Sequence, residues 1–276
     1  MFLRVLLTSV LLTSSAFATD FERTLTVAPS SDIYVATSSG RIHIYPGSDS
    51  QVHIKAHVYS GWNTSGEVDD RISRIALSPP IQQTANELHI GDVNAENRHL
   101  YNNITIDYEI SAPKGIALNL RSGSGDVEID NLSRFLKAET GSGSIRAHGI
   151  GGPAELHTGS GDVDLEQSAP GEVKASTGSG TIRLHSLNGS VSARTGSGDI
   201  EADGRVAGES RLQSGSGSIR LHSGGSARFN VDASTGSGSI RIAGAPETEH
   251  HHVSAPINGG GPTLEVRTGS GDIQID

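Results

Sequence analysis

The chain of 276 residues carries a formal net charge of −10, contains no cysteine, and has 35 glycines but only 4% aromatic residues. The negative charge argues against a nucleic-acid partner, because lysine and arginine on phosphates supply most of that affinity. Without cysteine, neither a disulfide nor a cysteine-linked lipid can hold the protein. The scarcity of aromatic residues predicts a thin core of Ile, Val, Leu and Ala, as in proteins that bury side chains by stacking repeats.

Residues 1–18 are typical of a secretory signal peptide. Arg4 precedes an apolar stretch, and Ala16-Phe17-Ala18 provides small residues before a cleavage point. No later stretch approaches the roughly 20 apolar residues that cross a bilayer. We therefore expect an exported protein that is not an integral membrane protein. The sequence leaves open whether it is located in the periplasm, on the cell surface or in the medium.

Residues 19–112 predict an N-terminal β region that is continuous with the rest of the chain. Apolar and polar residues alternate from residue 32 to 57, as in strands with one buried face. Residues 37–44, TSSGRIHI, form a degenerate copy of a phrase that recurs later in the chain. An irregular insertion near 59–103 interrupts the pattern and includes a charged, helix-like stretch at 67–77.

Residues 113–276 contain eight copies of this phrase, each built around a Gly-Ser-Gly turn between two short strands. A fixed period of 18 or 19 residues separates the regular copies and predicts a solenoid. Ser or Thr precedes the first glycine of every copy, so a column of hydroxyl groups can form hydrogen bonds along the stack. The copies are RSGSGDVEID at 121–130, TGSGSIRAH at 140–148, TGSGDVDLE at 158–166, TGSGTIRLH at 177–185, TGSGDIEAD at 195–203, SGSGSIRLH at 214–222, TGSGSIRIA at 235–243 and TGSGDIQID at 268–276.

Acidic and basic copies alternate through the first six units. The third residue after the second glycine of each turn reads Glu128, Arg146, Asp164, Arg183, Glu201 and Arg220. If each copy formed one rung of a parallel stack, equivalent residues would lie about 4.8 Å apart and opposite charges would be neighbours. Two copies per rung would stack like charges instead. The alternation therefore favours one parallel rung per copy.

The segment ITIDYEISAPKGIALNLRSGSGDVEI at 104–129, followed by the repeats, resembles a family of exported bacterial β-strand-repeat proteins named putative adhesins, whose activity is largely unassigned. The resemblance covers nearly all of the chain after the signal peptide and implies no catalytic residues. It implies an all-β fold, a single-stranded parallel β-helix or β-solenoid of right-handed form. With the period of the repeats, this gives about 18–19 residues per rung.

Few residues are candidates for a site. His148, His185 and His222 read as members of a surface ion ladder in preference to metal ligands or catalytic groups. In the calcium-binding nonapeptide pattern the Asp stands one residue further from the glycine, so the Asp directly after the turn does not fit it. We also expect no cofactor. The weak metal candidates are His250, His251 and His252 in an irregular insertion. The weak candidates for a ligand surface are Tyr59, Trp62 and Tyr101, since the repeats offer no aromatic platform.

Three functional hypotheses remain open. The first is a non-enzymatic, adhesin-like binding or structural module of the bacterial cell envelope, with an unknown envelope or surface component as its partner. The second is a carbohydrate-active or polymer-processing β-helix enzyme, which would need several acids converging in one groove. The third is a self-assembling envelope scaffold, because a solenoid that ended openly at its C-terminal rung could join another copy end to end.

Overall fold

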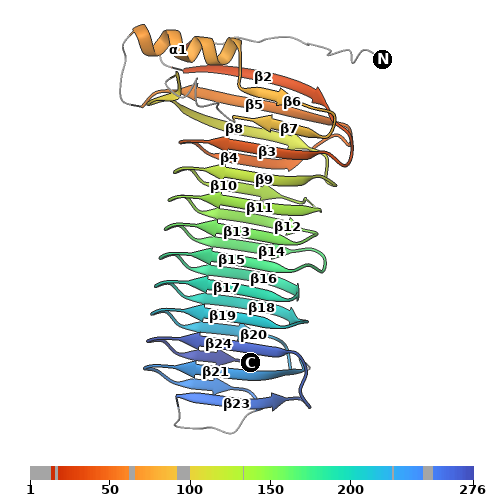
Figure 1. The fold of residues 1–276 in the computed structure, drawn as a ribbon, viewed down its shortest axis with the longest axis vertical. Helices are drawn as coiled ribbons and strands as arrows, with labels where there is room; N and C mark the ends of the chain where they lie inside the picture. The colour runs from red at the N-terminus through yellow and green to blue at the C-terminus, as the bar shows by residue number, and fades with distance from the viewer. Residues whose placement is uncertain are drawn as a thin grey trace. The chain divides into compact units, whose positions relative to one another are not determined.

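The computed structural model describes residues 14–15, 18–61, 66–91, 100–132, 134–225, 227–244 and 251–276. The chain divides into two compact units, residues 1–140 and 141–276. Both are built almost entirely from short β-strands, drawn as arrows in Figure 1. The two units are described in turn.

The first unit contains eleven strands and one helix among its described residues. The strands in chain order are β1 (Ser14–Ser15), β2 (Ala18–Thr26), β3 (Asp32–Thr37), β4 (Ile42–Pro46), β5 (Gln51–Tyr59), β6 (Ile81–Gln83), β7 (Glu87–Ile90), β8 (Thr105–Ala112), β9 (Ala117–Ser122), β10 (Val127–Asp130) and β11 (Phe135–Thr140). Helix α1 covers Gly66–Leu77 and confirms the helix expected at 67–77. Its buried residues, Val68, Ile72, Ile75 and Ala76, recur at helical spacing, and the helix packs against β2.

Two sheets form in this unit. In one, β2, β5 and β8 are antiparallel neighbours, and β8, β4 and β10 continue in parallel. In the other, β6 pairs antiparallel with β7, and β7, β3, β9 and β11 run parallel. Ile42 of β4 lies opposite Val127 of β10, so the degenerate phrase at 37–44 is in register with the first full copy. This confirms that it forms a rung of the same kind.

The second unit contains fourteen strands among its described residues. They are β12 (Ile145–Ile150), β13 (Ala154–Thr158), β14 (Val163–Gln167), β15 (Val173–Thr177), β16 (Ile182–Gly189), β17 (Val191–Thr195), β18 (Ile200–Val206), β19 (Ser210–Ser214), β20 (Ile219–His222), β21 (Phe229–Thr235), β22 (Ile240–Ile242), β23 (His252–Ile257), β24 (Thr263–Thr268) and β25 (Ile273–Ile275).

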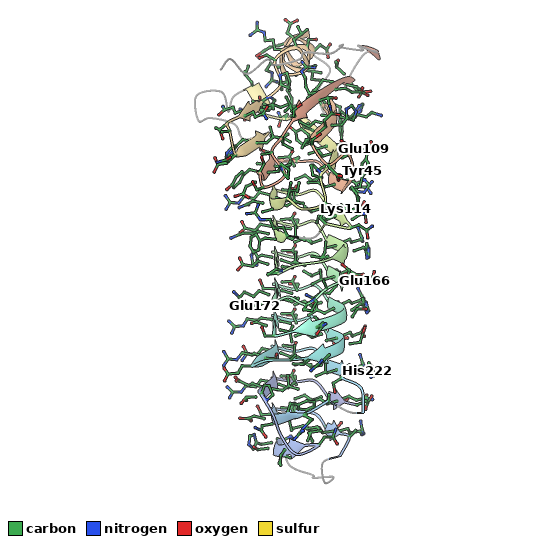
Figure 2. All side chains as sticks on the ribbon, turned by 90° about the vertical axis from the view of Figure 1, so that its right-hand side faces the viewer. Tyr45, Glu109, Lys114, Glu166, Glu172 and His222 are labelled. Atoms are coloured by element: carbon green, nitrogen blue, oxygen red, sulfur yellow. The ribbon has the colours of Figure 1, made fainter. Side chains whose placement is uncertain are left out.

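Each repeat in this unit supplies one strand to each of two parallel sheets, which is the solenoid that the sequence predicts. Val163 lies opposite both Ile145 and Ile182, so neighbouring rungs are offset by 18 and 19 residues. Side chains alternate along the strands, with Ile and Leu buried and Arg and His outside. Figure 2 shows Glu166 and His222 pointing outward on one face of the unit and Glu172 on the opposite face.

Hydroxyl groups link the turns of successive rungs. The Thr177 hydroxyl donates to the carbonyl of Gly161 in the preceding rung at 2.8 Å. It also accepts the backbone N–H of Gly180 in its own turn at 3.1 Å. The same pair of bonds is made by Thr158, Thr195 and Ser214. The expected hydroxyl column exists, but its members bond to backbone groups and not to one another.

The glycines of the turns are required by the close approach of neighbouring backbones. A Cβ atom on Gly180 would lie 1.9 Å from the carbonyl oxygen of Gly161, and one on Gly198 would lie 1.9 Å from that of Gly180. These distances are far below any van der Waals contact. Side-chain-bearing residues are therefore excluded by the stack itself.

The last repeat in the sequence is not the last rung of the stack. Strand β24 lies between β19 and β21, and β25 lies between β20 and β22, each parallel to both neighbours. Strand β23 then pairs antiparallel with the far side of β21. The expectation of an open C-terminal rung at Asp276, with end-to-end self-association through it, is therefore wrong. Both edges of that rung are already hydrogen-bonded.

This insertion extends the charge alternation to the end of the stack. In chain order the sixth and seventh copies are both basic, with Arg220 and Arg241 at equivalent positions. In the structure Gln274 of the acidic last copy lies between them. Asp272 then accepts the backbone N–H of Ser239 at 2.7 Å. The reordered rungs avoid stacking two arginines directly on each other.

Candidate functional site

The charged residues of the repeats form the predicted ladder. Glu201 lies opposite both Arg183 and Arg220, with nearest N–O distances of 3.8 and 3.3 Å. His185 Nδ1 lies 2.6 Å from Asp203 Oδ2, and His222 lies 3.2 Å from Asp276 of the inserted rung. His148 lies 3.8 Å from Glu166. All these groups lie on the open surface, and each is engaged by its neighbour.

The aspartates directly after the glycine turns are structural. Asp162 Oδ1 accepts the N–H of Thr181 at 2.8 Å, and Asp199 Oδ1 accepts that of Ser218 at 2.7 Å. For Asp272, the hydrogen bonds from the backbone and hydroxyl of Ser239 lower the pKa of the carboxyl. Their carboxylates thus bind the next rung, which explains Asp at this position without calcium.

His250, the first weak metal candidate, lies outside the described residues. His251 and His252 lie at the start of β23, and the His251 carbonyl accepts the N–H of Thr235 at 2.9 Å. His252 Nδ1 lies 3.6 Å from Asp232 Oδ1 on β21. Across the part of the chain that the structure describes, no three His, Cys, Asp or Glu residues are grouped as a metal site would need.

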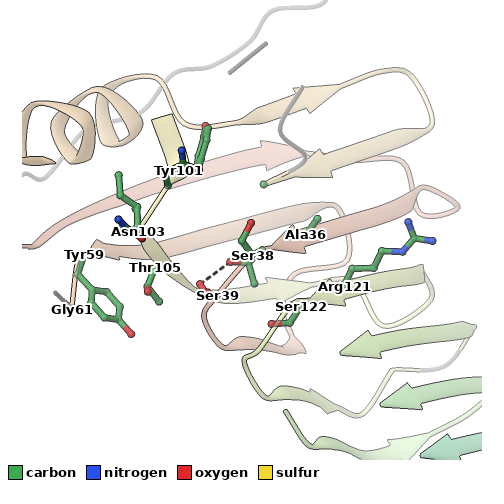
Figure 3. Close-up of a pocket in the computed structure, with 15 residues that line it drawn as sticks. Ala36, Ser38, Ser39, Tyr59, Gly61, Tyr101, Asn103, Thr105, Arg121 and Ser122 are labelled. Atoms are coloured by element: carbon green, nitrogen blue, oxygen red, sulfur yellow. Dashed lines mark hydrogen bonds between the residues drawn. The ribbon is translucent and has the colours of Figure 1, made fainter. Parts of the chain in front are cut away.

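The first unit contains a cleft of about 910 Å³, formed where the repeat pattern is interrupted. It lies around the turn that joins β3 to β4 (Figure 3). The described residues that line it are Ala36, Thr37, Ser38, Ser39, Tyr59, Gly61, Gly91, Tyr101, Asn102, Asn103, Ile104, Thr105, Arg121, Ser122 and Gly123. Its volume falls in the range of small-molecule binding sites.

The cleft arises because the column of glycine turns ends at residues 37–40. On one side this turn stacks on the next turn of its kind, where the Ser122 hydroxyl donates to the Gly40 carbonyl at 3.1 Å. On the other side its neighbour is the start of β8, where Ile106 donates its N–H to the Ser39 carbonyl at 3.1 Å. Among the described residues, no further glycine turn stacks on Ser38 and Ser39 on that side.

Tyr59 is held in a fixed orientation at the edge of the cleft. It ends β5 and lies opposite Thr105 of β8. Burial, and then the charge and hydrogen bond of the nearby Asp107 carboxylate, raise the pKa of Tyr59. Its ring centroid lies 5.1 Å from that of His57. These contacts fix the ring, which Figure 3 shows extending away from the strand toward the open side.

Tyr101 lines the wall and has a different environment. Burial raises its pKa, and burial raises even more strongly the pKa of Tyr108, which is fully enclosed. The Tyr108 hydroxyl finds no hydrogen-bond partner among the described residues. A Cβ on Gly91 would lie 2.9 Å from it, so this hydroxyl lies directly beneath the cleft lining.

The lining residues carry little charge. Arg121 is the one formally charged residue among the described lining residues, and its Nε lies 3.2 Å from Glu139 Oε2. Figure 3 shows its side chain pointing away from Ser38 and Ser39. No Asp, Glu or His belongs to the described lining. The cleft can therefore offer hydroxyl, amide and aromatic groups, but no pair of carboxylic acids.

The structure brings together two of the three residues that the sequence singles out as a ligand surface. Tyr59 and Tyr101 line the same cleft, whereas Trp62 lies outside the described residues. Sequence reasoning missed Ser38, Ser39 and Asn102. The two serines belong to a copy of the repeat, so the sequence indicated a structural role for them. No sequence pattern distinguishes these serines from those of the other turns, and only the three-dimensional arrangement does.

No helix of 18 or more residues in the described chain is apolar enough to cross a membrane.

Comparisons with known proteins give further findings. No curated protein matches the chain. The chain is similar to the solved structure of a "putative adhesin" from Bacteroides fragilis NCTC 9343, with 14% identity, a TM-score of 0.46, and 93% of this chain and 97% of that chain covered.

A second solved structure, a "putative lipid binding protein" from Parabacteroides distasonis ATCC 8503, has 16% identity and a TM-score of 0.42, with 93% of this chain and 96% of that one covered. A family profile adds an assignment for the sequence itself. The profile described as Toastrack DUF4097 matches residues 30–276, from just before β3 to the inserted last rung. The chain therefore belongs to the Toastrack DUF4097 family.

Proposed function

We propose that the protein is an exported, adhesin-like binding module of the bacterial cell envelope that performs no catalysis. One observation carries the proposal. The polar groups of the repeat turns hold the rungs together, whereas the cleft at the β3–β4 turn presents hydroxyl, amide and aromatic groups without a carboxylate among its described lining residues. Such a lining can bind a ligand but lacks the paired acids of a polysaccharide-cleaving site.

Export is supported by the pattern of residues 1–18. The test is a fusion of residues 1–18 to a reporter enzyme that is active only outside the cytoplasm. We expect activity from this fusion and its loss when Leu6→Arg and Leu7→Arg interrupt the apolar stretch. Equal activity from both fusions would contradict export by this segment.

Envelope binding is tested with the chain that begins at residue 19. It is mixed with isolated bacterial envelopes, and with separate glycan and lipid fractions from them, and the pelleted protein is measured. We expect the native protein to pellet with at least one fraction and the heat-denatured protein to show no matching selectivity. Hydrolysis of a purified envelope polymer by the native protein would favour the enzyme hypothesis, and failure to pellet with every fraction would contradict the proposal.

A further inference from the structure

We propose that the cleft at the β3–β4 turn binds an uncharged oligosaccharide through the ring of Tyr59 and the polar side chains around it. This rests on the proposed function and gives it a site and a ligand class. Four features of the first unit carry it: polar side chains without partners, a fixed aromatic ring, the absence of an available charge, and the size of the hollow.

The polar side chains in the cleft differ from those in the repeat turns by being uncommitted. Ser38, Ser39, Asn102, Asn103 and Thr105 make no side-chain hydrogen bond to any residue within the described ranges. Hydroxyl and amide groups both donate and accept, as sugar hydroxyls do. Five such groups around one hollow can therefore replace the water that a sugar loses on binding.

Asn103 adds a backbone constraint to this set. Its φ of 61° is in the left-handed region, which asparagine tolerates better than most residues. The Asn102 carbonyl accepts a hydrogen bond from Arg71 at 3.1 Å, so the backbone of this segment is anchored while the two amide side chains are exposed. The pair is thus presented on a held turn, which reduces the ordering cost of binding.

Tyr59 provides the apolar contact that a sugar ring needs. One face of a pyranose ring carries C–H groups, which pack on an aromatic ring. The contact with the His57 ring and the pairing of Tyr59 with Thr105 of β8 orient the Tyr59 side chain before any ligand arrives. A fixed aromatic anchor gives affinity without paying rotamer entropy on binding.

The nearly uncharged lining of the cleft favours uncharged ligands over acidic and basic ones. The Arg121 side chain points away from Ser38 and Ser39 (Figure 3) and pairs with Glu139, and no carboxylate belongs to the described lining. An ionic ligand would therefore lose its hydration without gaining a counter-charge, which is costly. The cleft of about 910 Å³ is large enough for more than a single small group. An uncharged chain of sugars satisfies all four features.

The test is calorimetric titration of the chain from residue 19 with chitotriose, cellotriose and maltotriose, and with the acidic trigalacturonate. We expect at least one neutral trisaccharide to bind, and trigalacturonate to bind more weakly. Tyr59→Ala should weaken binding about tenfold, and Asn102→Ala about threefold. Tyr45→Ala and Asn119→Ala, matched residues that do not line the cleft, should bind as the native protein does.

Three results would overturn the assignment: no binding of any neutral trisaccharide by the folded native protein, tighter binding of trigalacturonate, or unchanged binding by both cleft variants. Asn102 is exposed, so Asn102→Ala tests the cleft even if Tyr59→Ala folds poorly. Envelope pelleting by Tyr59→Ala separates the two proposals. If it pellets normally and no trisaccharide binds, the cleft assignment fails while the envelope function stands. If trisaccharides bind and nothing pellets, the envelope function fails.

Discussion

The turn at 37–40 and the turns of residues 141–276 share one sequence phrase but have different neighbours. Around Thr177 a further glycine turn lies on each side, and the hydroxyl and backbone groups bond to them. Around Ser38 and Ser39 the described residues place a glycine turn on one side, and the other side faces the cleft. The same phrase therefore leaves hydroxyl groups without partners, among the described residues, where its column of glycine turns ends.

The largest expected effect comes from breaking the stack itself. Gly180→Ala places a Cβ about where the Gly161 carbonyl oxygen now lies, 1.9 Å away, so one backbone must move. We expect a loss of about 3 kcal/mol in the free energy of unfolding, measured by urea denaturation. Gly225→Ala is the matched control, because its Cβ would meet nothing within 4 Å. Equal stability of the two variants would contradict the close-approach argument.

Removal of one turn hydroxyl should have the next largest effect. Thr177→Val keeps the shape of the side chain but leaves the Gly161 carbonyl and the Gly180 N–H without their partner. We expect about 2 kcal/mol of destabilisation, whereas Thr177→Ser, which keeps the hydroxyl, should lose much less. A Thr177→Val variant no less stable than Thr177→Ser would contradict the assignment of this loss to the hydroxyl hydrogen bonds.

The charge ladder should contribute less. Glu201→Lys replaces two attractive contacts, with Arg183 and Arg220, by two repulsive ones. Because the groups are exposed, we expect a loss of about 1 kcal/mol that shrinks as salt is added. Glu209→Lys makes the same charge change at an exposed turn residue and serves as the control. A loss that does not depend on salt would point to packing.

The smallest effect is a pH dependence at the inserted rung. The pKa of Asp272 is lowered by hydrogen bonds from Ser239, so its stabilisation is present above the unfolded value of about 3.9 and is lost as pH falls through the folded value. Asp272→Asn keeps an acceptor but removes the charge. We expect this variant to be slightly less stable than the native protein at neutral pH and to match it in acid. A gap that widened in acid would contradict this sign.

Much of the fold could be predicted because several independent patterns in the sequence indicate the same architecture. Alternation along β16, the glycine turns and the charge order all indicate parallel rungs of 18 or 19 residues, which the registers confirm. The helix at 66–77 follows from its apolar spacing. The antiparallel arrangement of β2, β5 and β8 could not be predicted, because alternation fixes which face is buried but not strand direction.

The order of the last rungs was missed for a different reason. The turn and strand residues of the seventh and eighth copies are nearly the same, so either fits either place by shape alone. Two basic copies in succession, with Arg220 and Arg241, were the signal that an acidic copy lies between them. For the cleft, the rarity of aromatic residues pointed to Tyr59 and Tyr101. The serines could be recognised only from their missing neighbour in three dimensions.

The inserted rung has a consequence for how the second unit is assembled. A solenoid whose rungs follow chain order can grow as it is synthesised, each rung closing on the one before. Here β19 meets β24 only after the intervening segment has been made, a register separated by 54 residues. Until residues 263–276 arrive, β20 and β22 lack a common partner and leave Leu221 and Ile240 without the strand between them. The order of β20, β25 and β22 can therefore be completed only after residues 263–276 have been synthesised, and until then unpaired strand edges are available to a second chain.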